Sequence, residues 1–296
     1  MRAILFTIDD AYVMPFKVAW HSLVSTNSLP EDVQPFIVHE GTLSDGSMRE
    51  IATFLGARDH EPVFIDAAGY MPTDLPLWPG DRLTRTSYLR LFTASMLPKT
   101  VSRVVYLDAD GIALQSIRDL FDVPLSAPLA AADHLAPVQA LRLFGPTGGR
   151  YLQSGVLIID LEAWRREQVE ATFRTILADR ADWMSLHDQD VLNLAFEGRW
   201  PPLPVWFNTC RFVRSYAARS DVAANVRFLH LDGTTKPWTR YTRSWEYQAW
   251  YTAHEHALGQ PFDTRTLLGS RLPAAWRHAK KTVAMGLGRS RIPELW

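Results

Sequence analysis

Residues Val104–Gly111 read VVYLDADG, an apolar run that ends in two aspartates and a glycine. Such runs are typical of strands buried on both faces of a parallel sheet, and neither aspartate belongs in such a core. Ligands of open α/β sheets bind beyond the carboxyl ends of the strands, where Asp108 and Asp110 can direct oxygen ligands at a divalent ion. Gly111 fits a turn there, because glycine adopts backbone conformations that other residues avoid. The same residues also fit an ordinary strand-ending turn, and the motif alone does not decide between the two interpretations.

Similar short apolar runs alternate with stretches of helical periodicity on both sides of this segment, which predicts an α/β fold around a mostly parallel sheet. The expected strands are Arg2–Ile8, Gln34–His39, Pro62–Asp66, Arg103–Leu107, Leu129–Ala132, Gly155–Asp160 and Val226–His230. The expected helices are Met14–Ser25, Asp45–Leu55, Arg85–Met96, Leu161–Asp179, Asp188–Phe196 and Trp245–Leu258. The first strand is followed by Asp9 and Asp10, so two acidic strand ends are expected at one rim of the sheet. The Pro- and Gly-rich segments Gly69–Asp81 and His134–Arg150 are expected to be excursions from that rim.

Composition limits the class of protein. The 296 residues are 47% apolar and 21% charged, which fits a globular chain and excludes collagen-like, coiled-coil and disordered classes. The net charge of −1 gives no overall field to recruit nucleic acid, so no nucleic-acid partner is expected. The single cysteine, Cys210, cannot form an intrachain disulfide and is expected to be a buried small hydrophobe. No apolar run reaches the roughly 18 residues needed to span a bilayer.

Two enzyme families use an acidic strand end of this kind. The phrase Leu107–Gly111 resembles the first motif of haloacid-dehalogenase-type phosphatases, in which the first acid is a nucleophile and the second a general acid. That family requires a downstream lysine and a later acidic pair or Gly-Asp motif. The lysines after Asp110 are Lys236, Lys280 and Lys281, and neither Asp-Asp nor Gly-Asp follows. The phosphatase interpretation therefore lacks its partner residues.

The second family is indicated by four further phrases. They are TSYLRLF (Thr86–Phe92), YLQSGVLIIDLEAWR (Tyr151–Arg165), HDQDVLN (His187–Asn193) and HLDGTTKPW (His230–Trp238). Together with the Asp-x-Asp motif, this series resembles glycosyltransferase family 8, a retaining group that includes bacterial lipopolysaccharide galactosyl- and glucosyltransferases and glycogenin. The resemblance runs from Ile4 to about Trp238. Each phrase alone is modest evidence, and five in the same order are specific.

The resemblance implies a GT-A fold with a Rossmann-like sheet, and transfer of glucose or galactose from a UDP-sugar with Mn²⁺, or alternatively Mg²⁺. It implies that Asp108, Asp110 and His230 hold the metal ion. Two carboxylates and an imidazole make a mixed oxygen and nitrogen shell that suits Mn²⁺. Without the resemblance, His230 would be interpreted as a satisfied histidine of the core.

The resemblance also implies which residues bind the donor: Thr7, Asp9, Asp10, Tyr12, Arg90, Asp108, Ala109, Asp133, Gln153, Gly233 and Lys236. Lys236 corresponds to a lysine that meets the diphosphate, and Gly233 allows the backbone to approach it. The acids after the first strand and the ring of Tyr12 correspond to a segment that contacts the nucleoside. The alternatives are a solvated Lys236, an ordinary acidic helix start at Asp9 and Asp10, and an Arg90 that snorkels to the surface.

Two positions depart from the pattern of the family. Gln153 replaces an asparagine and so displaces its amide by one methylene, and Ala11 replaces a polar residue found in some members. Gln189 and Asp188 are the catalytic candidates, because Gln189 corresponds to the residue closest to the β face of the anomeric carbon and Asp188 to an acid that binds sugar hydroxyls. An amide is a poor nucleophile, so Gln189 is interpreted as a dipole that stabilises an oxocarbenium-like centre, in a front-face transfer.

The expected domains are a GT-A domain over residues 1–270 and a basic tail over residues 271–296. Within the first, residues 1–132 are expected mainly to bind the nucleotide sugar and residues 133–270 the donor sugar and acceptor. The tail has six basic residues and one acid, so residues 273–291 are either a membrane-surface helix or a solvated one. The expected partners are a glycan or lipid-linked glycan acceptor and, through the tail, an anionic membrane surface. The protein is expected in the cytoplasm or at the inner membrane face. A non-catalytic sugar-binding protein on the same fold is the rival interpretation.

Overall fold

The computed structural model describes residues 1–73, 75, 85–135, 137–146, 149–179, 186–210 and 224–268. The strands are β1 (Arg2–Thr7), β2 (Val33–His39), β3 (Val63–Asp66), β4 (Arg103–Leu107), β5 (Gly111–Ala113), β6 (Leu129–Asp133), β7 (Leu152–Asp160), β8 (Pro202–Leu203) and β9 (Phe228–His230). The helices are α1 (Val13–Ser25), α2 (Asp45–Gly56), α3 (Arg85–Tyr88), α4 (Thr93–Met96), α5 (Pro137–Phe144), α6 (Leu161–Arg166), α7 (Val169–Asp179), α8 (His187–Phe196), α11 (Trp245–Leu258) and α12 (Arg265–Leu268).

The fold is built around a central sheet of seven strands. Their order is β3-β2-β1-β4-β7-β6-β8. Strands β3, β2, β1 and β4 are parallel to one another, and β6 is parallel to β8. Strand β7 runs antiparallel to both β4 and β6. The structure therefore confirms the predicted α/β class and mostly parallel sheet. A second, two-stranded sheet pairs β5 with β9 and sets Gly111 opposite His230.

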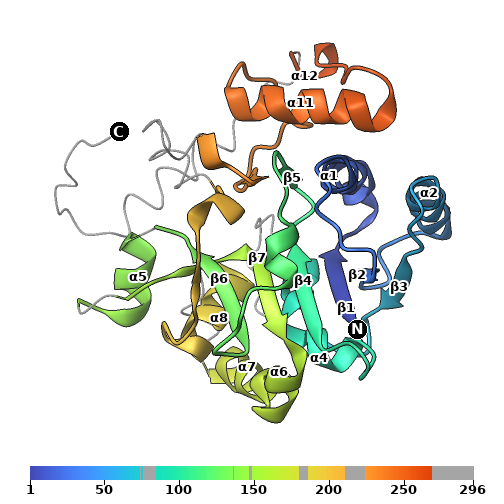
Figure 1. Cartoon of the computed structure of the whole chain (residues 1–296). Helices are drawn as coiled ribbons and strands as arrows, with labels where there is room; N and C mark the ends of the chain where they lie inside the picture. Colours follow the sequence, from blue (N-terminus) through green and yellow to red (C-terminus); the bar gives the residue numbers. More distant parts are fainter. Residues whose placement is uncertain are drawn as a thin grey trace.

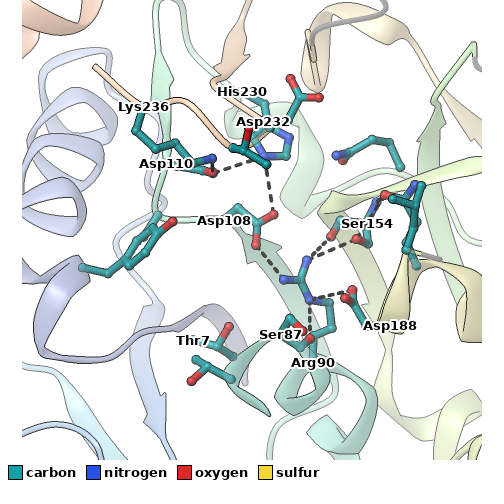
Figure 2. Close-up of a pocket in the computed structure, with 18 of the residues that line it drawn as sticks. Thr7, Ser87, Arg90, Asp108, Asp110, Ser154, Asp188, His230, Asp232 and Lys236 are labelled. Atoms are coloured by element: carbon teal, nitrogen blue, oxygen red, sulfur yellow. Dashed lines mark hydrogen bonds and ion pairs between the residues drawn. The ribbon is translucent and has the colours of Figure 1, made fainter. Parts of the chain in front are cut away.

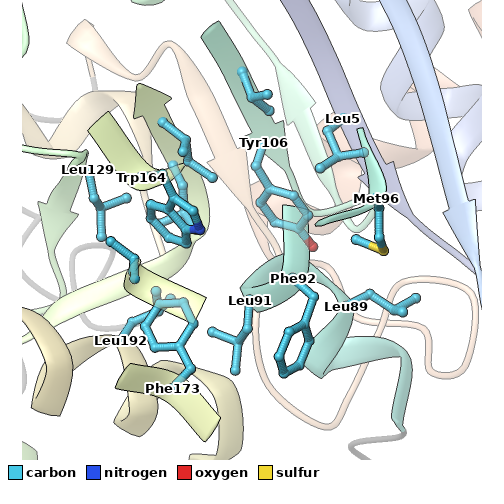
Figure 3. Packing of buried hydrophobic residues seen from close by; sticks show 14 of the residues in the cluster. Leu5, Leu89, Leu91, Phe92, Met96, Tyr106, Leu129, Trp164, Phe173 and Leu192 are labelled. Carbon is cyan, nitrogen blue, oxygen red and sulfur yellow. The ribbon is translucent and has the colours of Figure 1, made fainter. Parts of the chain in front are cut away.

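Helices cover both faces of the central sheet (Figure 1). Alternate residues of a strand point to opposite faces, so Leu5 packs with the helices on one side and Phe6 with those on the other. The first face holds the cluster in Figure 3, in which Trp164, Phe173 and Leu192 of α6, α7 and α8 lie against the sheet. The second face is covered by α1 and α2. Helix α11 packs on α1 and covers a third cluster around Trp250.

Several element boundaries differ from the expectations. The expected helix Arg85–Met96 is divided into α3, a 3₁₀ turn over Leu89–Phe92, and α4. The expected helix Leu161–Asp179 is interrupted at Gln168, whose φ of 51° is left-handed, so it forms α6 and α7. Strands β5 and β8 were not expected, because segments of two or three residues carry no periodicity. Helix α5 lies within the expected excursion His134–Arg150.

Two expectations concern segments that are described in part or not at all. Of the excursion Gly69–Asp81, the described residues are 69–73 and 75, and the basic tail over residues 271–296 lies outside the described residues. In the part of the chain that is described, every helix is too short or too polar to cross a bilayer. Cys210 is buried, as predicted.

Candidate active site

A pocket of about 650 Å³ opens beyond the carboxyl ends of β1 and β4. Residues from both strand ends, from the segment after β9 and from the start of α8 line it, so segments distant in sequence converge there. Of the expected site residues, the pocket is lined by Thr7, Asp9, Tyr12, Arg90, Asp108, Ala109, Asp110, Gln153, Asp188, Gln189, His230, Gly233 and Lys236. Its volume is in the usual range for small-ligand sites, roughly 300–1,000 Å³.

Two expected donor-binding residues are placed elsewhere. Asp10 is exposed, and its carboxylate accepts a hydrogen bond from the backbone N–H of Ser44 at 2.9 Å. Hydrogen bonds lower the pKa of Asp10. The one with the Ser47 hydroxyl has the largest effect, and the one with the Ser44 backbone has the next largest. Asp133 closes the turn after β6 by accepting from the N–H of Leu135 at 2.9 Å. Neither residue is among those that line the pocket.

The Asp-x-Asp motif and His230 converge on one point. His230 Nε2 lies 3.1 Å from Asp110 Oδ1 and 3.5 Å from Asp108 Oδ2 (Figure 2). The three side chains each offer a ligand atom, and these atoms lie within 4.8 Å of one another. The pairing of β5 with β9 produces this arrangement, because it joins the segment after β4 to the strand that ends at His230.

The orientation of His230 is fixed by two amides behind it. Nδ1 of His230 lies 3.0 Å from Asn208 Oδ1, and Nδ2 of Asn208 donates to Gln153 Oε1 at 2.5 Å. Because Asn208 Oδ1 can only accept, Nδ1 of His230 carries the proton and Nε2 faces the carboxylates. Hydrogen bonds of this kind set the tautomer of metal-binding histidines. Gln153, the departure from the family pattern, thus orients the imidazole through Asn208.

Two glycines make room for this cluster. A Cβ on Gly155 of β7 would lie 2.2 Å from His230 Cε1 and 2.9 Å from Asp108 Oδ2. A Cβ on Gly111 would lie 2.2 Å from the Phe228 ring. The expected reason for Gly111, an unusual backbone conformation, was therefore wrong: it is needed for close packing. Gly233 does have a left-handed φ of 93°.

Lys236 places a cation against the acidic cluster. Its Nζ donates to Asp110 Oδ2 and to the carbonyl of Leu231. Burial alone would raise the pKa of Asp110, but Lys236 and then His230 outweigh it and lower that pKa. Burial likewise opposes the charged form of His230, and Asp110 reverses this and raises the pKa of His230. The other oxygen of Asp110, Oδ1, is buried and has no hydrogen bond from the described residues.

Arg90 joins the motif to α8. It is buried rather than snorkelling, and it bridges Asp108 Oδ1 at 3.0 Å and Asp188 Oδ2 at 3.2 Å (Figure 2). Burial alone would lower the pKa of Arg90, but the two carboxylates raise it. Burial raises the pKa of Asp188, and Arg90 only partly opposes this. Asp188 Oδ2 is buried and accepts no hydrogen bond with good geometry from the described residues.

Gln189 is held by its neighbours on both sides. Its Oε1 accepts from the N–H of Ser154 at 3.0 Å, and its Nε2 lies 3.3 Å from His134 Nδ1. An amide nitrogen only donates, so His134 Nδ1 is the acceptor. Burial lowers the pKa of His134 to about 4, which keeps its imidazole neutral near pH 7. His187, just before Asp188, has a left-handed φ of 46° and is held by a 3.0 Å contact with the Tyr88 hydroxyl.

Aromatic rings lie at the end of the pocket near β1. Tyr12 and Trp238 line the pocket and meet edge to face, with ring centroids 5.7 Å apart. Asp9 accepts from the N–H of Tyr12 at 3.2 Å and so caps the turn that carries the ring. Thr7 Oγ1 lies 3.0 Å from the Tyr106 hydroxyl, which in turn donates to Asp108.

Sequence reasoning missed several residues of the site. Thr86, Ser87, Ser154, Asp232, Thr234 and Trp238 line the pocket and lie inside the phrases that resemble the family, so their neighbourhood was marked but not their role. His134 and Gln139 lie in the excursion after β6, where no pattern was available. Asn208 follows a three-residue 3₁₀ turn, and nothing in the local sequence indicates its contact with His230.

Comparison with known proteins identifies the family and the fold. The model of the family "Glycosyl transferase family 8" matches residues 3–242. General stress protein A of Bacillus subtilis is 22% identical over 85% of this chain and 96% of its own length. A lipopolysaccharide 1,2-glucosyltransferase of Escherichia coli K12 is 29% identical over 53% of this chain and half of its own length. The solved structure of galactosyltransferase LgtC, in complex with donor and acceptor sugar analogues, matches 94% of this chain and 99% of that one, with 22% identity and a TM-score of 0.70. This likeness confirms the predicted GT-A fold.

Proposed function

The chain belongs to glycosyl transferase family 8 and is a glycosyltransferase, and from this premise we propose that it transfers a hexose from a UDP-sugar to a glycan acceptor with retention of configuration. The observation that carries the proposal is one pocket in which Asp108, Asp110 and His230 converge beside Lys236, while Asp188 and Gln189 line another part of it. A nucleoside diphosphate offers anionic oxygens to Lys236 and to a cation held by the first group, and a sugar offers the hydroxyls that suit the second group.

The first group fits a divalent metal ion of the Mn²⁺ type. Asp110 Oδ1 is a buried oxygen without a hydrogen bond from the described residues, Gly155 leaves space that a Cβ would fill, and the Lys236 ammonium already sits where a cation is favoured. Asp108, Asp110 and His230 would hold the ion, which supplies a Lewis acid that stabilises charge on the departing UDP. Lys236 adds a second positive charge for the diphosphate.

The nucleoside and the sugar are bound by different residues. Tyr12, braced by Trp238, offers an aromatic ring to the base. Asp188 lines the pocket, and its Oδ2 has no well-aligned donor from the described residues, so a sugar hydroxyl that reaches this carboxylate satisfies it. The paired Arg90 keeps Asp188 in place and balances the charge of Asp108.

Gln189 acts as a fixed dipole rather than as a nucleophile. Its amide is anchored between Ser154 and His134, so it is preorganised and need not reorient when positive charge develops at the anomeric carbon. Asp188, the carboxylate next to it, is paired with Arg90. We therefore favour a front-face reaction, in which the departing diphosphate accepts the proton of the acceptor hydroxyl and the product keeps the α configuration.

The named relatives support a glucose or galactose donor and a glycan acceptor. The E. coli proteins are lipopolysaccharide 1,2-glucosyltransferases, and LgtC is a galactosyltransferase solved with donor and acceptor sugar analogues. For this chain, lipopolysaccharide biosynthesis is the corresponding proposal. A panel of UDP-sugars with lipopolysaccharide-type glycans is the direct way to choose the donor.

Release of UDP, measured with Mn²⁺ and with a chelator, tests the proposal. We expect Mn²⁺-dependent release, and we expect Asp110→Asn to lower its rate by about 100- to 1,000-fold. The reason is that each 1.36 kcal/mol added to the activation barrier lowers the rate about tenfold. Asp119→Asn removes an exposed carboxylate that does not line the pocket and should retain the wild-type rate.

Three results would contradict the proposal. Full activity of Asp110→Asn would remove the metal assignment, and a β-linked product by NMR would remove the retaining mechanism. Tight binding of UDP-sugars with no release or transfer in any combination would favour the non-catalytic sugar-binding protein.

A further inference from the structure

A second set of metal-ligating side chains lies beside the first. His134, Cys210 and Asp232 each offer one ligand atom, and these atoms lie within 4.8 Å of one another. His134 and Asp232 line the pocket, whereas Cys210 is fully buried behind them. Cysteine is not part of the family pattern described above, and of these three residues only His134, which anchors Gln189, has a part in the proposed transfer reaction.

The backbone explains why these three residues meet. The N–H of His134 donates to the carbonyl of Tyr151 at 2.8 Å, which extends the pairing of β6 with β7 by one residue. Thr209 bridges to Leu229 of β9, so Cys210 runs alongside the end of that strand. Asp232 follows the same strand end. The cluster is therefore anchored to two sheets.

The two clusters share their supporting segments. Asn208 orients His230, and Cys210 follows two residues later; His230 belongs to the first cluster, and Asp232 follows it by two residues. The neighbouring charges are close enough that Asp232 and His230 both act on the pKa of His134. An ion in the second cluster would therefore lie next to the Asp-x-Asp site, in the same pocket.

The donor types of the second cluster differ from those of the first. A thiolate, an imidazole and a carboxylate form a softer set than two carboxylates and an imidazole, and thiolate ligands select Zn²⁺ over Mn²⁺ and Mg²⁺. Zinc bonds of roughly 2.0–2.3 Å bring ligand atoms to about 3.3–3.7 Å from one another, so small side-chain movements complete the shell. A tetrahedral Zn²⁺ ion held by three protein ligands takes one further ligand.

We propose that His134, Cys210 and Asp232 form a Zn²⁺ site next to the Asp-x-Asp centre, and that Zn²⁺ bound there inhibits transfer. The site itself stands independently of the reaction, whereas the inhibition rests on the proposed function.

The inhibition follows from the contact between Gln189 and His134. If Zn²⁺ takes Nδ1 of His134, the hydrogen bond from Gln189 Nε2 is lost directly. If Zn²⁺ takes Nε2 of His134, the ring proton moves to Nδ1. Two N–H donors, that of Nδ1 and that of Gln189 Nε2, then face each other and the hydrogen bond is lost. A flip of the amide would point its NH₂ at the N–H of Ser154, which Oε1 now accepts. Either way Gln189 loses one of its two anchors.

Cobalt substitution tests the site without any assay of transfer. The chain has a single cysteine, so a thiolate-to-Co²⁺ charge-transfer band can arise only from Cys210. With Mn²⁺ present in excess to fill the first cluster, we expect this band in the intact chain, its removal by one equivalent of Zn²⁺, and its loss in Cys210→Ser. Asp110→Asn, altered only in the first cluster, should keep the band. Absence of the band in the intact chain, or a band that Zn²⁺ does not displace, would overturn the site.

A second variant covers the case in which Cys210→Ser does not fold. Asp232→Asn has almost the same shape, and it should keep the thiolate band at saturation while weakening Co²⁺ binding by about tenfold or more. Unchanged Co²⁺ affinity in Asp232→Asn would remove Asp232 from the site.

The inhibition is tested by the effect of Zn²⁺ on the transfer rate. Micromolar Zn²⁺ should reduce the Mn²⁺-supported rate of the wild type and not that of Cys210→Ser. Equal inhibition of both would refute the inhibitory role while leaving the site and the transferase activity intact.

Discussion

The two ends of the pocket differ in charge. The cation end, formed by Asp108, Asp110, His230 and Lys236, gathers buried and partly buried charges that compensate one another. The amide end, formed by His134, Gln153, Ser154 and Gln189, contains neutral groups whose polar atoms are satisfied by their neighbours. A charged cluster can exchange one cation for another, whereas a neutral network works only while every member keeps its orientation. The cation end is therefore suited to binding, and the amide end to fixed positioning.

Gly155 is where the two ends touch, so its substitution should have the largest effect. In Gly155→Ala the new Cβ would lie 2.2 Å from His230 Cε1 and 2.9 Å from Asp108 Oδ2, and the metal ligands must move apart. We expect UDP release to fall by about 1,000-fold and the stability to fall by about 1–3 kcal/mol, as for other overpacked cores. Gly56→Ala, at a helix end where a Cβ meets nothing within 4 Å, is the matched control. Near-normal Mn²⁺ activation of Gly155→Ala would show that the metal ligands do not depend on the space at Gly155, and so that the two ends are not coupled there.

Asn208 tests the comparison more finely, because it lies between the amide of Gln153 and the imidazole of His230. Asn208→Leu removes the acceptor for Nδ1 of His230 without touching a ligand. We expect the Mn²⁺ concentration for half activation to rise by about 10- to 100-fold, with a smaller change in the rate at saturating metal. Asn208→Asp keeps the acceptor and should recover much of the Mn²⁺ affinity. A loss of rate with unchanged Mn²⁺ affinity would place Asn208 in the amide network alone.

The two aspartates of the cation end stand out in the sequence for a physical reason. Charged residues at the carboxyl end of a buried strand cannot be core material, so Asp108 and Asp110 stand out in a short window. Strands β1, β4 and β7 were predictable because each is a run of mostly buried apolar residues. His230 and Lys236 needed the resemblance to the family, since neither their strand nor their loop has a periodicity that marks them.

The amide end could not be predicted in the same way. Its members come from β7, from α8 and from the segment after β6, and they meet only through the packing of the sheet on α8. Asp10 and Asp133 show the converse: they fit the local pattern of donor-binding acids, but Asp133 accepts from the turn beside it and Asp10 accepts from the N–H of Ser44 at the start of α2. A cap and a ligand look alike in sequence, because both put an acid after a strand.

The amide end should also be visible as a pH dependence of stability. Burial lowers the pKa of His134 from 6.5 to about 4, so between these values the unfolded chain binds the proton and the folded chain does not. The free energy of unfolding contributed by this residue therefore decreases as the pH falls through that window, with a slope of at most about 1.4 kcal/mol per pH unit. Urea unfolding in the presence of a chelator, at several pH values between 4 and 7, should show a shallower slope in His134→Gln than in the wild type. Parallel curves for the two proteins would mean that His134 is protonated without cost, and the neutral character of the amide end would then have to be given up.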